Sequence, residues 1–555
     1  MDFKLVKGKN NEDILSVQGL LLHSKYNPIS QAEKKAKEMY RPNYVHILFG
    51  YGNQYLVNSL IKEFKNDEIL IIIDPLISKG IIEPKVTYKN EFIFVHEDFT
   101  KIKAFLDTLD EIQHKGLYTT ICSFNYDKLF SEEYKYFLES IRDIQQSKIV
   151  NDNTIILRAE KWQYNFVQNL ESMLDNGTIE KLKGIYECPI VVASGGPSLT
   201  KQIPLIKNYR DSIILIAAGS TINSLLVNGI SPDYVLSIDG DIANNKHFED
   251  VYSEKIDLIY SYFNYPDILS HFKNKYYFSD SLESKNTVFL KEFTDEEIPN
   301  LIGGGSVAHY ALSFAEFISK SSAPIAIIGQ DLAYTDNVTH AKGNKQQAII
   351  ETGKKFIYID GYYEGKVKSD IPFNSMKVGF ENLINNFLEN TDRIYNCTEG
   401  GAKIKDLHQI SFLSFLETYT TNPVKKYNSD DSIDKKVIDK KKIAEYLRKC
   451  EEALELISRG LMKLERNKSL INFDASVIKS LDEIDDFLRE KQDELPLQYI
   501  MQLVEVLLLK NEDLSYCDTT SKIFRRKKEA NEFVYKKIEE ALELFRQKLL
   551  KIKNR

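Results

Sequence analysis

A glycine turn in the middle of the chain has residue types that can bind phosphate. Residues 188–203 read CPIVVASGGPSLTKQI, which predicts a buried strand over Ile190–Ala193, a tight turn over Ser194–Pro197, and a helix from Ser198 with its hydroxyl near the N-cap. Glycines let the main chain approach an anion, and a helix N-terminus attracts negative charge. A purely structural strand-to-helix turn would have the same pattern. No Gly-Lys-Ser/Thr follows, which disfavours a P-loop ATPase.

Two more predicted strands end in small polar or acidic residues. Residues 213–217 form an apolar run that is followed by Gly219 and Ser220, and a third run, 234–238, is followed by two aspartates. In open α/β sheets a ligand binds beyond the carboxyl ends of the strands. We therefore expect these strand ends to converge with the first glycine turn on one crevice.

The two aspartates, Asp239 and Asp241, are separated by one residue. They resemble the DxD pair with which many sugar-nucleotide enzymes hold a divalent ion. Carboxylates at this spacing are also common as turn and N-cap residues. A metal site and a structural turn both remain open at this point.

A second set of polar strand ends follows downstream. The sequence NLIGGGSVAHYALSFAEF predicts a helix that begins at Ser306 after Gly304 and Gly305, and the strand 325–328 ends in Gly329-Gln330-Asp331. A second helix start suited to an anion and a polar loop would supply the other half of a composite site.

The loop after this strand contains Tyr334 and His340. A histidine near its unperturbed pKa of about 6.5 can accept or donate a proton near neutral pH without special tuning. His340 is therefore a candidate acid or base. A surface histidine without a function would fit the same pattern.

The elements that position these residues fall into three zones. Residues 1–150 predict a small α/β domain with a mainly parallel sheet, and residues 151–420 predict a second α/β domain. Residues 421–555 are rich in Lys, Glu and Leu with three-and-four spacing, which predicts a bundle of three to five amphipathic helices. The front domain is expected to contain strands within 44–52, 68–76, 91–98 and 117–124.

The front domain has one turn of its own that could bind a ligand. Gly50 and Gly52 follow its first predicted parallel strand, and Asp74 ends the next one. This arrangement resembles half of a dinucleotide or methyl-donor site, although the third glycine is missing. Tight packing of a helix on the sheet is the alternative interpretation.

Composition excludes several classes of protein. A chain of 555 residues is too long for a single compact core, which excludes a single-domain protein. The sequence has 73 Lys and Arg against 81 Asp and Glu, so it lacks the excess of basic residues that is typical of a nucleic-acid binder. The five cysteines are scattered without a CxxC pair, which suits neither a disulfide framework nor a zinc site. No signal-peptide pattern or apolar run of membrane-spanning length occurs. We expect a cytoplasmic protein that binds no membrane.

Five motifs, in order, resemble those of the motility-associated factor (Maf) flagellin glycosyltransferases of bacteria. They are VVASGGPSL, NGISPDYVLSIDG, GGGSVAHYALSFA, IAIIGQDLAYTDNVTHAKG and NCTEGGAKIKDL. The central zone is also similar, more distantly, to bacterial CMP-sialic-acid sialyltransferases. The resemblance implies a Rossmann-like, sialyltransferase-type catalytic domain between an α/β front domain and an all-α helical tail.

The resemblance also assigns roles to residues. The residues of the glycine turn would hold the nucleotide phosphate. Gly305 and Ser306 would bind the nucleotide or the carboxylate of the donor sugar, and Asp331 would anchor the loop at the end of its strand. Where the sialyltransferases place a second tyrosine, this chain has His340 if one insertion is allowed, so the resemblance implies that a histidine replaces a phosphate partner of that family. The complete predicted donor-binding set is Gly195, Gly196, Pro197, Ser198, Gly219, Ser220, Gly304, Gly305, Ser306, Gln330 and Asp331.

The implied activity is transfer of a nonulosonic acid, of pseudaminic or legionaminic type, from CMP to Ser or Thr of flagellin, as flagellar assembly and motility require. His340, Asp239 and Tyr334 are the predicted catalytic residues, and Asp239 with Asp241 would hold Mg²⁺ or Mn²⁺ if a metal takes part. The tail would receive flagellin, or would be a structural or oligomerisation cap. The alternatives are a 6-hydroxymethylpterin pyrophosphokinase that uses ATP and Mg²⁺, and a non-catalytic flagellin-binding chaperone.

Overall fold

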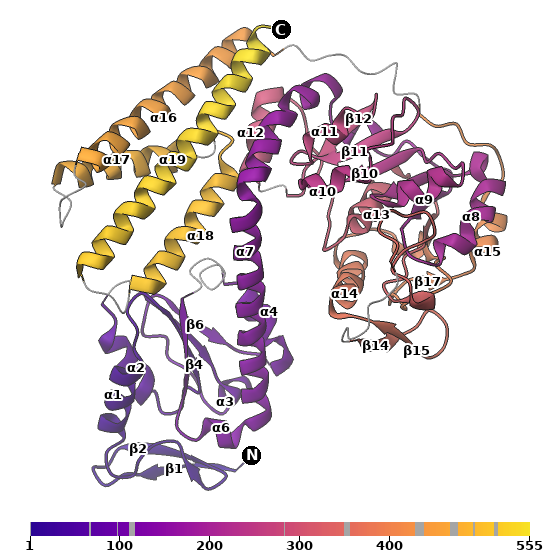
Figure 1. Cartoon of the computed structure of the whole chain (residues 1–555). Coiled ribbons are helices and arrows are strands. Elements are labelled where there is room, and N and C mark those ends of the chain that lie inside the picture. The colour runs from indigo at the N-terminus through magenta and orange to yellow at the C-terminus, as the bar shows by residue number, and fades with distance from the viewer. Residues whose placement is uncertain are drawn as a thin grey trace. The chain divides into compact units, whose positions relative to one another are not determined.

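The chain divides into two compact units that each combine segments distant in sequence. A computed structural model describes residues 2–555 except 66–67, 97, 110–116, 282–283, 349–355, 428–437, 467–474, 492–493 and 516–519. One unit comprises Met1–Leu157 with Val504–Ala530, and the other Arg158–Leu503 with Asn531–Arg555. The long helix α7, Ser131–Asn176, begins in the first unit and ends in the second (Figure 1). The zone boundaries near 150 and 420 stay a prediction.

The first unit is built around a parallel sheet, as its continuous apolar runs, separated by longer amphipathic segments, predict. Its strand order is β6-β5-β4-β7, and all four strands run parallel. Both faces are covered, which explains why β4 and β5 are apolar almost throughout and fully buried. The strands are β4 (Val45–Phe49), β5 (Ile69–Ile73), β6 (Glu91–Phe94) and β7 (Tyr118–Cys122). Its short helices are α1 (Pro28–Met39), α2 (Tyr55–Glu63), α3 (Pro75–Ser78), α4 (Ile102–Asp107) and α6 (Tyr126–Leu129).

An additional antiparallel sheet at the N-terminus was not predicted. It consists of β1 (Phe3–Lys7), β2 (Asp13–Val17) and β3 (Leu20–Leu21). Strand β1 is largely exposed, whereas β2 is largely buried. The alternation in β1 is therefore too weak to mark it as a half-buried strand.

The glycine turn of the first unit is a packing turn. A Cβ built on Gly50 would lie 2.6 Å from the Tyr126 ring. The fully buried Asp74 carboxylate accepts the Tyr51 N–H at 2.6 Å and the Tyr126 hydroxyl at 2.6 Å, and burial raises its pKa. Because these donors already engage the carboxylate, the structure favours the packing interpretation over a cofactor site.

The second unit contains an eight-stranded sheet in the order β12-β11-β10-β9-β8-β13-β16-β17. All of its neighbouring strands pair in parallel, and the predicted strands at 190, 213, 234 and 325 are confirmed as β8, β9, β10 and β13. The strands are β8 (Ile190–Ala193), β9 (Ile214–Ala218), β10 (Tyr234–Ser237), β11 (Asp257–Ser261), β12 (Lys275–Phe278), β13 (Ile325–Ile328), β16 (Ile394–Asn396) and β17 (His408–Gln409).

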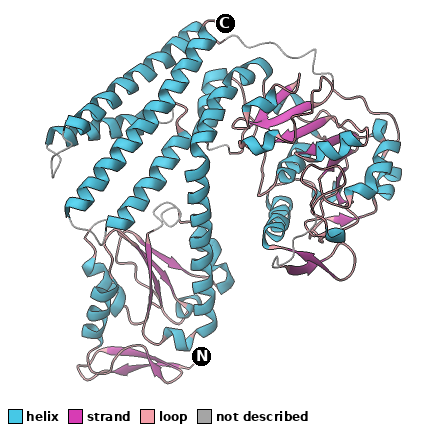
Figure 2. Cartoon of the chain, viewed as in Figure 1, coloured by secondary structure: helices cyan, strands magenta, loops and turns pink. Residues whose placement is uncertain are grey.

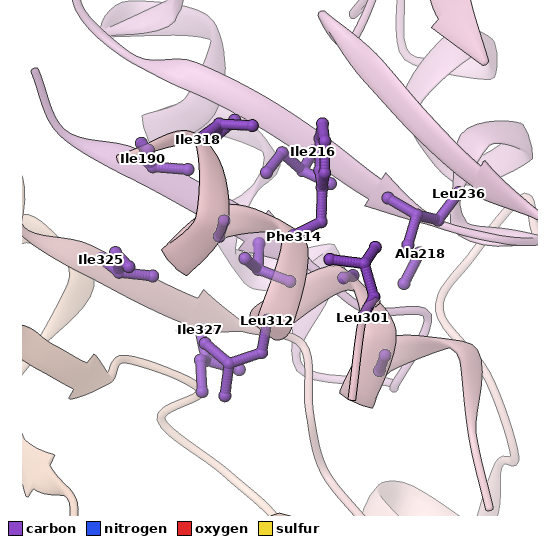
Figure 3. Packing of buried hydrophobic residues seen from close by; sticks show 14 of the residues in the cluster. Ile190, Ile216, Ala218, Leu236, Leu301, Leu312, Phe314, Ile318, Ile325 and Ile327 are labelled. Atoms are coloured by element: carbon purple, nitrogen blue, oxygen red, sulfur yellow. The ribbon is translucent and has the colours of Figure 1, made fainter. Parts of the chain in front are cut away.

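Helix α13, Val307–Ile318, forms the centre of this unit's core. Its Leu312, Phe314 and Ile318 are fully buried and pack against side chains of the sheet (Figure 3). Full burial of each such side chain contributes roughly 1.5–3 kcal/mol, so this helix is held firmly on the sheet. The other helices of this part of the chain are α8 (Leu199–Asn208), α9 (Thr221–Val227), α10 (Ile242–Asn245), α11 (Pro266–Leu269), α12 (Lys285–Thr294), α14 (Ile371–Asn386) and α15 (Phe412–Tyr419).

A two-stranded antiparallel hairpin precedes α14. It is formed by β14, Ile357–Asp360, and β15, Lys366–Ser369. The Tyr334 N–H donates to the Lys368 carbonyl at 2.8 Å, so this hairpin is attached to the loop that follows β13.

The C-terminal part is helical, as its three-and-four spacing predicts (Figure 2). Its helices are α16 (Lys440–Arg466), α17 (Ala475–Lys491), α18 (Gln498–Ser515) and α19 (Thr520–Lys553). Tyr446 of α16 and Phe545 of α19 pack edge-to-face against Phe289 of α12, within the second unit. No helix in the described part of the chain is both long and apolar enough to cross a membrane. Of the five cysteines, Cys517 lies outside the described residues.

Candidate active site

A pocket lies where the strand order of the second unit reverses. From β8 the chain adds β9, β10, β11 and β12 on one side and then returns to place β13 on the other side of β8. Such a switch point opens a crevice beyond the carboxyl ends of the strands. A pocket of about 260 Å³ is found there, lined by residues that follow β8, β9 and β13 and by the start of α13.

Eight of the predicted site residues line this pocket. They are Gly195, Gly196, Pro197, Ser220, Ser306, Gln330, Asp331 and His340. The other predicted residues, which are Ser198, Gly219, Gly304, Gly305, Tyr334, Asp239 and Asp241, are not among the residues that line it. Thus two of the three early strand ends meet here with β13, and the third does not.

A buried carboxylate ties the glycine turn to the β13 loop. Asp331 accepts the Ser198 hydroxyl at 2.6 Å, the Ser198 N–H at 3.1 Å and the Thr335 hydroxyl at 2.8 Å. Burial raises the pKa of Asp331. Ser198 is the N-cap residue of α8, as predicted, but its hydroxyl makes no cap bond to the helix and donates to Asp331 instead. Both donors of Ser198 are therefore engaged by a side chain of the protein.

Gly196 allows this carboxylate to come close. A Cβ on Gly196 would overlap both Asp331 Oδ2 and the Gly329 carbonyl oxygen. The Gly196 N–H donates to the same carbonyl at 2.8 Å. This glycine is thus required by close approach of the β13 loop.

Two polar atoms of the pocket wall have no partner in the described residues. The hydroxyl of Ser194 and Oε1 of Gln330 are buried and lack a hydrogen bond there. Buried polar groups are nearly always satisfied, so an unpaired pair in a pocket wall suits a polar ligand. The sequence predicts Gln330 as a donor-binding residue because it follows the end of a strand. It predicts Ser194 as a turn residue only, without a role in binding.

His340 lies at the pocket beside the glycine turn. The neighbouring Ala341 N–H donates to the Gly195 carbonyl at 2.9 Å, which holds the loop against that turn. Nδ1 of His340 lies 3.1 Å from Thr339 Oγ1. Burial lowers the pKa of His340 below its ordinary value of 6.5, so the imidazole is neutral at about pH 7 and can accept a proton.

Tyr334 is placed behind the pocket. Its side chain is buried, and its hydroxyl donates to Asp370 Oδ2 at 2.6 Å. The other oxygen of Asp370 accepts the Phe373 N–H at 2.9 Å and so caps α14. Phe373 and Met376 of α14 also line the pocket, and the sequence motifs did not predict either as a site residue. The Asp-Ile-Pro start of α14 could have indicated a helix, but not that this helix lies beside the pocket.

The aspartate pair is bound to cations of α7. Asp239 pairs with Arg158 at 3.1 Å, and Asp241 pairs with Lys161 at 3.2 Å. Asp241 also caps α10 by accepting the Ala243 N–H, and this bond together with Lys161 lowers its pKa. Within the described residues no group of three or more His, Cys, Asp and Glu side chains could hold a metal ion. The present geometry suits the turn-and-cap interpretation better than a metal site.

The triple glycine serves packing. A Cβ on Gly303 would overlap the Tyr310 ring, and one on Gly304 would lie 3.2 Å from His309. Ser306 caps α13 as predicted by accepting the Ala308 N–H at 3.3 Å. Gly219, at φ +53°, lets the end of β9 approach Val307, because an added Cβ would lie 3.1 Å from Val307 Cγ1. These glycines therefore bring the α13 N-terminus to the pocket without lining it.

Comparison with known proteins identifies one related fold and one related family. Residues 164–337 match the profile of the family described as 6-hydroxymethylpterin diphosphokinase MptE-like. The solved structure of a Maf glycosyltransferase from Magnetospirillum magneticum AMB-1 superposes with a TM-score of 0.59 at 14% identity, covering 100% of this chain and 90% of that chain. The chain has the fold of a Maf glycosyltransferase. No curated protein matches the sequence. At this identity the likeness concerns the fold, and at that level the resemblance predicted from the five motifs is confirmed.

Proposed function

We propose that the chain is a protein O-glycosyltransferase that moves a nonulosonic acid, of pseudaminic or legionaminic type, from a CMP donor to Ser or Thr of flagellin. The observation that supports this most is the pocket at the switch point, where the glycine turn, the α13 N-terminus and a neutral histidine meet. The full-length likeness in fold to a Maf glycosyltransferase also supports it.

In this proposal the CMP phosphate lies between the glycine turn and the start of α13. Gly195 and Gly196 line the pocket at this point, and the 12-residue helix α13 directs its positive dipole end toward it. Ser194 and Gln330 supply the two unpaired polar atoms for the rest of the donor. Ser198, bonded to Asp331, would position the turn rather than touch the phosphate.

The reaction breaks the bond between the anomeric carbon of the sugar and a phosphate oxygen, and CMP leaves with the electron pair. The hydroxyl oxygen of the acceptor bonds to that carbon, and its proton passes to the neutral imidazole of His340. A base so placed contributes about 10²–10⁴-fold to the rate. Tyr334 acts through Asp370 and α14 as a positioning residue.

A second candidate function is pterin pyrophosphokinase activity, which the description of the matching family favours. It would need ATP with Mg²⁺, and Asp239 with Asp241 would have to leave Arg158 and Lys161 to hold the ion. The matched residues are about a third of the chain, so this candidate leaves the helical tail unexplained.

Thermal unfolding with added nucleotides separates the two candidates. CMP should raise the melting temperature of the full chain, whereas ATP with Mg²⁺ should not. The opposite result would favour the pyrophosphokinase and refute the transferase.

A transfer assay then tests the catalytic role. Flagellin incubated with CMP-activated sugar and the protein should gain mass, and His340→Ala should abolish the gain while CMP binding persists. His408→Ala is the control, because His408 is an exposed histidine on β17 that does not line the pocket. Flagellin binding with no mass gain under any nucleotide would instead support the chaperone alternative.

A further inference from the structure

A second pocket, of about 570 Å³, lies in the same unit and has a different chemistry. It is formed by the β14–β15 hairpin, the first turns of α14 and the segment 403–405. Its volume is within the range of small-molecule sites. Tyrosines and lysines dominate its wall, and none of the predicted site residues belongs to it.

Two of its four lysines have an acidic partner. Lys366 pairs with Asp360 at 2.7 Å, and the largely buried Lys377 pairs with Glu381 at 2.6 Å. Lys403 and Lys405 are exposed and make no ion pair with any described residue. The pocket therefore presents the ammonium groups of Lys403 and Lys405, of which Lys403 also helps to lower the pKa of the Asp360 carboxyl in the same pocket.

Its aromatic rings are held in place yet open to solvent. The Tyr362 hydroxyl donates to the Asn396 carbonyl at 3.1 Å and to the Ile410 carbonyl at 3.0 Å, which anchors that ring. Tyr363 packs edge-on against Tyr362 with 5.0 Å between ring centroids and is 64% exposed. Tyr358 is 67% exposed. Tyr358 and Tyr363 line the same pocket, so their rings together offer flat apolar faces to a ligand.

The two pockets share helix α14. Phe373 and Met376 line the first pocket, while Asn374 and Lys377 line the second. Residues one apart on a helix face different directions, so the two pockets flank the same turns of α14. A molecule bound in the second pocket would thus lie next to the candidate active site.

We propose that the second pocket binds a carboxylated saccharide. Lys403 and Lys405 would pair with its carboxylate, and the exposed tyrosine rings would pack on the apolar C–H face of a pyranose. Glu364 and Asn374 would accept hydroxyl protons of the sugar. The Glu364 carboxylate repels a doubly charged phosphate more strongly than a singly charged carboxylate, which disfavours a nucleotide here.

Its role as an acceptor-side subsite rests on the proposed glycosyl transfer. There it would hold an acidic sugar already present on the acceptor, beside the donor pocket. The binding itself does not depend on that function, so the two can be tested separately.

Saturation-transfer NMR titration of the full chain with N-acetylneuraminic acid tests the proposal. We expect saturable binding, at least tenfold weaker binding of the methyl ester of the same sugar, and at least tenfold weaker binding of the acid to Lys403→Ala/Lys405→Ala. Tyr363→Ala should weaken both the acid and its ester. The control Lys207→Ala/Lys255→Ala removes two exposed lysines that line neither pocket and should bind within about twofold of the wild type.

Three results would overturn the proposal. They are absence of binding, equal binding of acid and ester, and displacement of the acid by CMP, which would place it in the first pocket. Stronger binding of inorganic phosphate, lost in the same lysine variant, would assign the pocket to phosphates. If CMP raises the melting temperature but the acidic sugar does not bind, only this inference fails; if the sugar binds and CMP does not, only the proposed function fails.

Discussion

Substitution of Gly196 by Ala tests the central contact of the candidate site. The added methyl group would overlap Asp331 Oδ2 and the Gly329 carbonyl oxygen, so the β13 loop must move away from the glycine turn. Overpacking of this kind costs about 1–3 kcal/mol, and loss of the bonds from Ser198 to the Asp331 carboxylate costs about 1.5–3 kcal/mol more. We therefore expect local destabilisation of about 3–6 kcal/mol.

Hydrogen exchange of the Ser198 amide measures this directly, because that N–H donates to Asp331. Since 1.4 kcal/mol corresponds to a factor of ten, exchange should accelerate by about 10²–10⁴-fold, up to the limit that unfolding of the whole unit imposes. The variant should also lose any stabilisation by CMP.

Gly305→Ala is the matched control. Its added Cβ would have only Met376 Cγ within 4 Å, at 3.8 Å, and its backbone is not left-handed. This change should leave Ser198 exchange unchanged and stabilise the chain by about 0.4–1 kcal/mol through the unfolded state. Exchange in Gly196→Ala within threefold of the wild type would refute the assignment of Asp331 as the clamp on this turn.

Three other predictions follow from single groups. Because burial lowers the pKa of His340 below 6.5, the loss of transfer rate at low pH should be centred below pH 6.5; a pH–rate profile that declines already between about pH 8 and 7 would contradict this role. Tyr334→Phe removes the bond to Asp370 and should cost about 1–3 kcal/mol and weaken CMP binding, measured by thermal shift, whereas unchanged CMP binding would remove its positioning role. Burial lowers the pKa of His46 to about 4, so protonation of His46 is less favourable in the folded first unit than in the unfolded chain. The contribution of neutral His46 to the free energy of unfolding is therefore complete above pH 6.5. As the pH falls from 6.5 toward 4, up to about 3 kcal/mol of this stability is lost. His46→Gln should flatten that dependence in hydrogen exchange of β4, and an equal dependence in both proteins would argue against His46 as its source.

The 32 tyrosines of the chain occupy two kinds of surroundings. Most buried tyrosines, such as Tyr234 and Tyr260, belong to the core of the second unit. Tyr358 and Tyr363 are exposed on the hairpin instead, where burial in a core does not explain so large a ring. Tyrosine abundance in the sequence cannot separate these two uses, since both place an aromatic residue in a β-rich segment.

Local patterns in the sequence were sufficient for the four strands of the first unit's parallel sheet, for β8, β9, β10 and β13, and for eight residues that line the pocket. Continuous apolar runs identified β4, β8 and β13, because a strand covered on both faces must be apolar at nearly every position. Polar residues directly after β8, β9 and β13 then marked the pocket, because parallel strands present their carboxyl ends at one edge.

Only the tertiary structure decided which side chains are available there. Ser198 and Asp331 are far apart in sequence, and their bond depends on β13 lying next to β8. In the same way Asp239 and Asp241 pair with cations of α7, and Tyr334 pairs with the cap of α14. Local sequence determines backbone propensity and polarity, but the partner of a polar side chain depends on which distant segment packs against it. The sequence alone therefore determined the buried strands β8, β9 and β13 and the polar residues at their carboxyl ends, and the packing of distant segments decided which residues can meet a ligand there.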